Sequence, residues 1–235
     1  RMIHLEGVRV DVPVPGATGG PWTSKTLLHD ITCVLAERRI AFIGANGSGK
    51  STLLRLLNGL TLATAGSVTV DGLDPVRDGA AVRQHVGFVF TDPLSQLLMP
   101  TPIEDVELSL RRVMPQRAER RARALELLAE RGLDRVAEQS IYDLSGGERQ
   151  LVALTAVLAV EPGVLVADEP TTLLDLGNRY RLRATLNALE QQIVVSTHDL
   201  DLAADADRVL VVSGGRIVAD GAPTEAIAFY EASQR

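Results

Sequence analysis

The segment from Gly44 to Ser51 constrains the fold more than any other part of the 235-residue chain. Its sequence, Gly-Ala-Asn-Gly-Ser-Gly-Lys-Ser, matches the P-loop pattern, in which a glycine-rich backbone surrounds phosphate groups with N–H donors. Lys50 would supply a positive charge to the β- and γ-phosphates, and the Ser51 hydroxyl would be a ligand for Mg²⁺. Residues 40–43 are strand-like and residues 52–57 are helical in pattern, so the loop is expected to open a helix whose dipole favours anions. The alternative, an ordinary glycine-rich turn, is disfavoured by this context.

The rest of the chain alternates predicted strands and helices. Strands are expected at residues 3–12, 30–35, 39–43, 66–72, 86–90, 163–167, 193–196, 209–212 and 216–218. Helices are expected at residues 53–60, 101–113, 116–131, 146–158, 176–190 and from 224 onward. Strand, helix, strand order favours a parallel sheet, so we predict an α/β protein. Residues 13–21 are rich in glycine and proline and are expected to form a loop.

A helical insertion is predicted from about residue 92 to residue 143. Thr101 and Glu104 have the spacing of a capping box, and Pro102 falls at the first helical position. Apolar residues then recur at helical spacing as far as Val113. This part therefore interrupts the α/β core.

Two carboxylates end the apolar stretch 164–167. Asp168 at the strand tip could hold Mg²⁺ directly or through water. Glu169, one residue further, could accept a proton from an attacking water. A plain loop start is the alternative, and the P-loop makes it the weaker interpretation.

The segment Ser145-Gly146-Gly147-Glu148 is a third candidate element. Ser145 and Glu148 fit a capping box, which predicts a helix starting here. Glycines in its first turn leave backbone N–H groups uncovered, which favours an anion site. A simple capped helix is the alternative that would hold without the P-loop.

Composition and charge restrict the function classes. The net charge is −6, whereas nucleic-acid-binding proteins usually carry the reverse sign or a basic stripe, so no nucleic-acid partner is expected. The arginine-rich stretch 111–123 is interrupted by Glu119 and is interpreted as a solvated helix face. No run of 18 apolar residues occurs, so no membrane span is expected. Cys33 is the only cysteine, which excludes an internal disulfide and fits a reducing compartment.

The three elements together resemble the ABC ATPase family over nearly the whole chain. The resemblance implies a P-loop NTPase (RecA-like) core with a parallel sheet, an N-terminal antiparallel β subdomain and an inserted α-helical subdomain. It also implies that the chain binds ATP and Mg²⁺ and hydrolyses ATP. The expected parts of this single domain are the core, residues 1–91 and 159–235, and the helical subdomain with its signature helix, residues 92–158.

The resemblance also assigns roles to individual residues. The Ser145-Gly146-Gly147 segment would bind the γ-phosphate of ATP held by a second subunit, and residues 172–175 are similar to the D-loop that couples the two sites. His198 is similar to the switch histidine that contacts the γ-phosphate. Trp22 follows a glycine/proline loop and is expected to stack on adenine, the alternative being packing on the N-terminal strands. The residues expected to contact the nucleotide are Trp22, Gly44, Ala45, Asn46, Gly47, Ser48, Gly49, Lys50, Ser51, Thr52, Ser145, Gly146 and Gly147. The expected catalytic residues are Glu169 and His198, and the expected metal ligands are Ser51, Asp168 and Thr91.

Thr91 departs from the family pattern. The family usually carries glutamine at the end of the strand predicted at 86–90, where it reaches Mg²⁺ and the attacking water. The shorter threonine could still hold a metal-bound water, but it puts tight coupling at this loop in doubt.

Residues 92–106 resemble the ATPases of energy-coupling-factor vitamin and metal importers. In that subgroup a short helix here, with Gln96 in its pattern, docks a transmembrane scaffold protein. Residues 86–112 and 167–176 look most like the biotin-importer member, so the expected function is to power biotin import. The alternatives are a cobalt, nickel or other vitamin importer and, from another class, a soluble ABC ATPase that does not transport.

The expected partners follow from the same resemblance. They are a second ATPase subunit, identical or related, a transmembrane scaffold subunit and a substrate-binding membrane subunit. The chain is therefore expected to be peripheral at the cytoplasmic face of the membrane.

Overall fold

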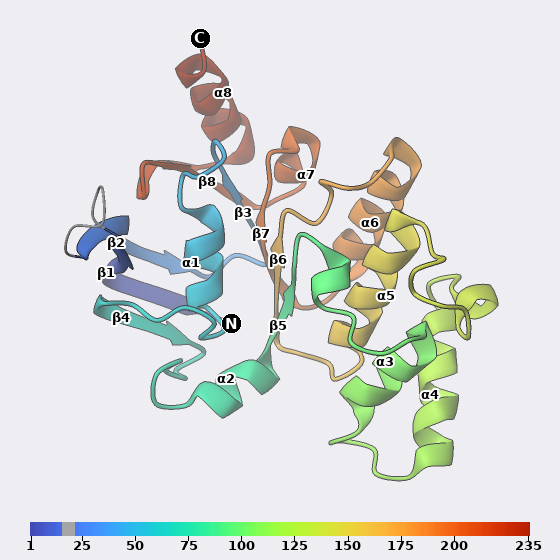
Figure 1. Cartoon of the computed structure of the whole chain (residues 1–235). Helices are drawn as coiled ribbons and strands as arrows, with labels where there is room; N and C mark the ends of the chain where they lie inside the picture. The colour runs from blue at the N-terminus through green and yellow to red at the C-terminus, as the bar shows by residue number, and fades with distance from the viewer. Residues whose placement is uncertain (16–21) are drawn as a thin grey trace.

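The computed structural model describes residues 1–15 and 22–235 (Figure 1). Its strands are β1 (Ile3–Val14), β2 (Thr23–Leu35), β3 (Arg39–Ile43), β4 (Ala65–Val70), β5 (Val86–Val89), β6 (Val164–Asp168), β7 (Gln192–Ser196), β8 (Arg208–Ser213) and β9 (Arg216–Gly221). Its α-helices are α1 (Lys50–Leu56), α2 (Gly79–His85), α3 (Pro102–Leu110), α4 (Arg117–Ala129), α5 (Gly146–Leu158), α6 (Leu176–Ala188), α7 (Leu200–Ala204) and α8 (Pro223–Ser233). The 3-10 helices within the described residues are η2 (Pro93–Ser95) and η3 (Asp134–Val136).

The strands form two sheets. The six-stranded sheet has the order β5-β6-β7-β3-β8-β9, parallel from β5 to β8 and closed by the antiparallel β8–β9 pair. The smaller sheet, β2-β1-β4, is antiparallel. Figure 1 shows α1 between the two sheets and helices α3 to α6 on the other side of the six-stranded sheet. The predicted fold class is confirmed.

The parallel strands are buried on both faces, and their side chains alternate between two cores. In β3, Ile40 and Phe42 pack in the core shared with α1 and the antiparallel sheet. Ala41 and Ile43 pack in the core shared with the helices of the opposite layer. Successive strand residues point to opposite faces, and a parallel sheet covered on both sides needs apolar residues at every position. This explains the uninterrupted apolar sequence of β3, β6 and β7.

The strand and helix predictions agree with the structure apart from short elements and the first part of β2, which begins at Thr23 although a strand is expected only from residue 30. The predicted helix at 146–158 has the observed bounds of α5, and the edge strand predicted at 66–72 is β4, at the edge of the antiparallel sheet. Helices α2 and α7 were not predicted. Of the loop predicted at 13–21, residues 13 and 14 belong to β1, and residues 16–21 lie outside the described residues. The division at residues 92 and 158 stays a prediction.

The capping box predicted at Thr101 is wrong. Thr101 is the N-cap residue of α3, but its side chain accepts no capping hydrogen bond. Thr101 Oγ1 instead donates to Glu104 Oε2 at 2.8 Å. Donation to a carboxylate does not by itself prevent capping, because Ser145 Oγ donates to Glu148 Oε2 and also accepts the N–H of Glu148. Pro102 does occupy the start of the helix, as predicted.

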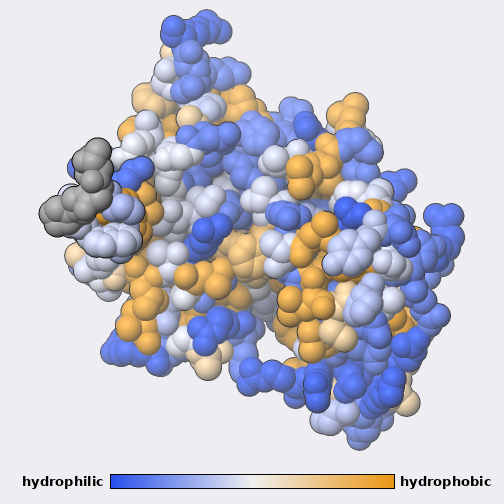
Figure 2. Space-filling view, in the orientation of Figure 1, coloured by the Kyte–Doolittle hydropathy of each residue, from blue (hydrophilic) through white to orange (hydrophobic). Residues whose placement is uncertain are grey.

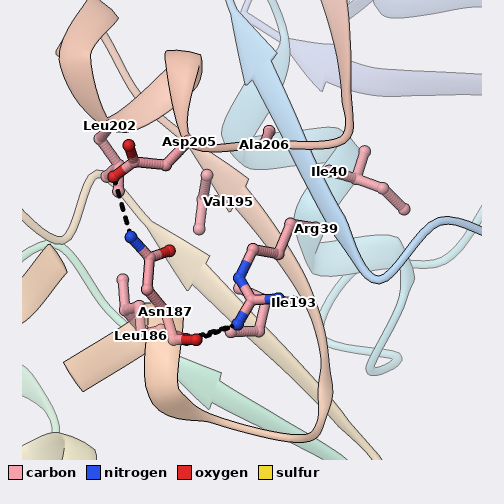
Figure 3. A pocket seen from close by; sticks show the side chains of 9 residues that line it. All are labelled: Arg39, Ile40, Leu186, Asn187, Ile193, Val195, Leu202, Asp205 and Ala206. Carbon is pink, nitrogen blue, oxygen red and sulfur yellow. Dashed lines mark hydrogen bonds between the residues drawn. The ribbon is translucent and has the colours of Figure 1, made fainter. Parts of the chain in front are cut away.

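A hollow of about 20 Å³ lies between α6, α7 and the amino ends of β3 and β7 (Figure 3). It has room for about one water molecule. Figure 3 shows Arg39 bound to the carbonyl oxygen of Asn187, whose carboxamide in turn donates to Asp205. Arg39 begins β3, whereas the P-loop follows the other end of that strand, so this hollow lies at the opposite edge of the sheet. Its polar residues fasten the end of α6 to the sheet.

Replacing Asp205 with asparagine should lower the free energy of unfolding at pH 7 by about 1–2 kcal/mol. Asp205 accepts two hydrogen bonds from Arg183, both 2.9 Å long, and these bonds are the main cause that lowers its pKa. A lowered pKa stabilises the fold above about 3.9, the value of an unfolded aspartate, and this contribution disappears as the pH falls through the folded pKa.

Denaturant unfolding at pH 7, 5 and 3.5 would measure the difference. The gap between the natural protein and the Asp205 variant should narrow at the lowest pH. The matched control is Asp134→Asn in the exposed helix η3, which should change stability little at any pH. A pH-independent gap would contradict the ionic origin of this contribution.

None of the helices within residues 1–15 and 22–235 combines the length and apolar character needed to cross a membrane.

Candidate active site

The carboxyl ends of β3, β5, β6 and β7 meet at one edge of the six-stranded sheet. In open parallel sheets, ligands bind outside these ends. The P-loop follows β3, Thr91 follows β5, Glu169 follows Asp168 at the end of β6, and His198 follows β7. The topology therefore brings most of the predicted site residues to one place.

The P-loop backbone has a geometry that requires glycine at two points. A methyl group at Gly44 would lie 2.1 Å from the carbonyl oxygen of Val212, in the neighbouring strand β8. Gly49, the N-cap of α1, has a φ of +112°, which residues with a side chain rarely adopt. Gly44 packs closely against β8, and Gly49 has a left-handed conformation at the N-cap. Together they curve the loop around the start of α1.

Lys50 is held under this loop. Its side chain is 5% exposed, and Nζ donates to the carbonyl oxygens of Gly44 at 2.7 Å and Ala45 at 3.2 Å. The hydroxyl oxygen of Ser48 is also buried and has no hydrogen-bond partner within the described part of the chain. A buried ammonium and an unpaired buried hydroxyl inside one glycine-rich turn are suited to phosphate oxygens.

Ser51 and Asp168 meet across the site. Ser51 Oγ donates to Asp168 Oδ1 at 2.9 Å, and Asp168 is only 2% exposed. Hydroxyl and carboxylate oxygens are the ligands that Mg²⁺ prefers, usually together with phosphate oxygens and water. The pair fits that ion.

Ser196 is a site residue that the sequence analysis missed. Its hydroxyl donates to Asp168 Oδ1 at 2.6 Å and accepts the N–H of Glu169 at 3.2 Å. Ser196 is the residue paired with Asp168 in the β6–β7 ladder. A polar residue at the tip of an otherwise apolar strand was the signal that could have identified it.

The carboxylate of Glu169 is held between the side chains of Lys50 and His198. Its Oε1 lies 3.5 Å from Lys50 Nζ, and its Oε2 accepts hydrogen bonds from Nδ1 of His198 at 2.8 Å and from the backbone N–H of His198 at 3.1 Å. An ionised carboxylate only accepts hydrogen bonds, so the imidazole donates from Nδ1. The φ of Glu169 is +50°, an uncommon value that this network and the bond from Glu169 N to the Ser196 carbonyl oxygen stabilise.

Thr91 lies beside these groups with its hydroxyl engaged. Thr91 Oγ1 donates to the backbone carbonyl oxygen of Asp168 at 2.9 Å, so it connects the ends of β5 and β6. Its role as a metal ligand stays a prediction.

Gln96 faces inward, because its Oε1 accepts the N–H of Phe90 at 3.2 Å and its Nε2 donates to the Ala153 carbonyl oxygen at 3.5 Å.

The capping box at the start of α5 is confirmed. Glu148 N donates to Ser145 Oγ at 3.2 Å, and Ser145 N donates to Glu148 Oε2 at 2.8 Å. Hydrogen bonds from the Ser145 hydroxyl and N–H lower the pKa of Glu148. Among the described residues no hydrogen bond or ion pair joins this segment to residues 44–51.

Trp22 is 70% exposed and directly precedes β2. At most a small part of its ring can therefore pack on the N-terminal strands, which was the alternative. Its predicted contact with adenine stays a prediction.

The comparisons with known proteins agree with this site. A family profile described as ABC transporter matches residues 28–172. The Biotin transport ATP-binding protein BioM of Rhizobium etli is 42% identical over 214 residues, which cover 91% of this chain and 95% of the relative. The Energy-coupling factor transporter ATP-binding protein EcfA1 of Halalkalibacterium halodurans is 39% identical over 197 residues, 82% of this chain and 70% of the relative.

A solved structure has the same fold. The dimeric ATP-binding cassette MJ0796, in a post-hydrolysis state with ADP and Pi, superposes with a TM-score of 0.83 at 29% identity, covering 94% of this chain and 98% of that one. The chain belongs to the ABC transporter family and is an ATP-hydrolysing subunit of that family.

Proposed function

We propose that this chain powers an importer of the energy-coupling-factor type and that biotin is the transported compound. The observation that carries the ATPase part is Glu169, whose carboxylate lies between Lys50 and His198 beside the Ser51–Asp168 pair. The substrate part rests on the identity to a biotin transport ATP-binding protein and to an energy-coupling-factor ATPase.

The site residues have the following proposed roles. Backbone N–H groups of residues 44–52 surround the phosphates, and Lys50 exchanges its carbonyl partners for β- and γ-phosphate oxygens. Ser51 and Asp168 would hold Mg²⁺, which would supply charge neutralisation on the phosphates, and Thr91 would hold a water bound to that ion. Glu169 orients the attacking water and accepts its proton, while His198 holds the Glu169 carboxylate and faces the γ-phosphate.

A second subunit completes the site in this proposal. Among the described residues Ser145, Gly146 and Gly147 make no hydrogen bond to the P-loop of their own chain, and the first turn of α5 would offer backbone N–H groups to an anion. The similar cassette MJ0796 is described as a dimer, which supports pairing of the same kind here. Trp22, exposed before β2, would cover the adenine. The second subunit is an identical or a related chain.

A groove beside α3 is the proposed docking surface for the membrane subunits. It has a volume of about 710 Å³ between β5, α3 and α5, and its lining combines apolar residues, among them Leu97, Leu98 and Val113, with the cationic Arg83 and Arg112. Figure 2 shows hydrophobic surface over the segment between β5 and α3. The side chain of Leu98 is 75% exposed there, and buried Asp105 fixes the backbone by accepting the N–H groups of Leu98 at 3.0 Å and Met99 at 3.1 Å. Burial raises the pKa of Asp105. Docking here would place the chain at the cytoplasmic face of the membrane.

Cells that make this chain with its membrane partners should accumulate labelled biotin. Leu98→Glu should reduce uptake at least tenfold, because it replaces an exposed apolar side chain of the docking surface with a charge, while ATP hydrolysis by the isolated subunit continues. The matched control is Phe229→Glu, an exposed apolar residue of α8 outside the groove, which should transport normally.

The possible outcomes separate the parts of the proposal. Uptake of cobalt, nickel or another vitamin instead of biotin would overturn the substrate alone. Normal uptake by the Leu98 variant would overturn the docking surface. If no membrane protein co-purifies with the chain, the importer function itself fails.

A further inference from the structure

Asn178, in the first turn of α6, makes contacts that the proposed function leaves unexplained. Helix α6 begins after Asp175, at the end of the segment 172–175 that is similar to a D-loop. Asp175 Oδ1 accepts the backbone N–H of Asn178 at 2.8 Å, which is an ordinary N-cap. In addition, Asn178 Nδ2 donates to Asp175 Oδ2 at 3.1 Å, so both oxygens of the Asp175 carboxylate are bound by one residue.

The other side of the Asn178 carboxamide covers the start of α5. A methyl group built on Gly147 would lie 2.2 Å from Cγ, 2.4 Å from Nδ2 and 2.6 Å from Oδ1 of Asn178. Such distances are far inside van der Waals contact, and Gly147 is buried. The neighbouring Gly146 is close to the same segment, because a methyl group there would lie 3.3 Å from the carbonyl oxygen of Leu173. Both glycines therefore lie directly against residues 173–178 of their own chain.

We infer that Asn178 is a positioning residue that fixes the D-loop-like segment to the first turn of α5. Glycine at position 147 is needed for this close approach, in addition to any contact with nucleotide. The inference rests on the proposed function, in which Ser145, Gly146 and Gly147 bind the nucleotide of the second subunit and residues 172–175 couple the two sites. Holding them in one geometry before pairing reduces the conformational entropy lost when the shared site closes.

The contact itself can be tested in the isolated subunit without nucleotide. Gly147→Ala should lower the Tm, because the new methyl group collides with the carboxamide. In the Asn178→Ala background the same change should be neutral or stabilising, because the three colliding atoms are gone and alanine favours a helix more than glycine. Equal Tm shifts of Gly147→Ala in both backgrounds would overturn the inference.

The positioning role has its own readout, the ATP concentration that gives half-maximal pairing. In a Glu169→Gln chain, which is expected to pair without hydrolysing ATP, Asn178→Ala should raise this concentration at least tenfold. Binding of a fluorescent ATP analogue by the dilute monomer should not change. The matched control is Asn187→Ala on the same helix, whose carboxamide binds Asp205 at the other edge of the sheet, and it should pair normally.

The results distinguish the inference from the proposed function. If the parent Glu169→Gln chain pairs with ATP and Asn178→Ala pairs equally well, Asn178 is only a helix cap and the inference is wrong. If the parent chain does not pair at all, the proposed shared site fails, and the positioning role fails with it even where the Tm shifts are coupled.

Discussion

Replacing Glu169 with glutamine should slow ATP hydrolysis by about 10²–10⁴-fold, the range typical for loss of a general base, while ATP still binds. Glutamine keeps the shape of the side chain, and its carbonyl oxygen can accept the N–H that His198 donates at 3.1 Å. It cannot take a proton from water at neutral pH. Uncleaved ATP should therefore hold two subunits together, visible as a doubled mass on size exclusion.

Glu161 provides a matched control for this variant. Glu161 precedes β6 and Glu169 follows it, and both residues have a φ of +50°. Glu161→Gln should hydrolyse ATP at the natural rate, because its side chain is exposed at the opposite edge of the sheet. Near-normal hydrolysis by the Glu169 variant would contradict the assignment of Glu169 as the base.

The second large effect is expected for Ser145→Arg, which should abolish hydrolysis without weakening nucleotide binding by the monomer. Ser145 is expected to serve the ATP of the second subunit, and an arginine there would block the γ-phosphate position in the one site that it faces. The change also removes an N-cap worth about 1 kcal/mol. Ser145→Ala separates these effects, because it removes the cap without adding bulk and should retain partial activity.

Mixing two inactive chains tests the shared geometry directly. Lys50→Ala removes the positive charge that faces the phosphates, so it should weaken nucleotide binding to the P-loop of the chain that carries it. A mixed dimer of the Ser145→Arg and Lys50→Ala chains retains one composite site with every required residue, so hydrolysis should reappear. No recovery at any mixing ratio would count against the shared site, unless turnover requires both sites to be intact.

Much of this architecture could be predicted because the decisive signals are local. The P-loop follows a strand and opens a helix, and Ser145 with Glu148 forms the predicted capping box. The apolar runs of β6 and β7 are long enough to distinguish buried parallel strands from half-buried strands, in which apolar and polar residues alternate. Asp168 and Glu169 could be selected because charged residues rarely end such a run without a purpose.

The missed features depend on contacts between distant residues. Ser196 acts through its register with Asp168, which requires knowing that β6 and β7 are neighbours. The close approach of Asn178 to Gly147 depends on how α5 and α6 pack. Helices α2 and α7 have seven and five residues, too short for a periodic pattern to accumulate. Thr101 was misjudged because a sequence shows the spacing of a capping box but not the direction of a hydroxyl.

The strand order has a consequence for how the protein is made. Ser51 and Asp168 are separated by 117 positions along the chain, and β3 lies between β7 and β8, both of which are synthesised long after it. Contacts so distant in sequence form slowly, and they cannot form on a ribosome until residues beyond His198 have emerged. A nascent or truncated chain that ends before residue 198 can therefore carry a complete P-loop while lacking His198, one of the residues of the proposed catalytic site.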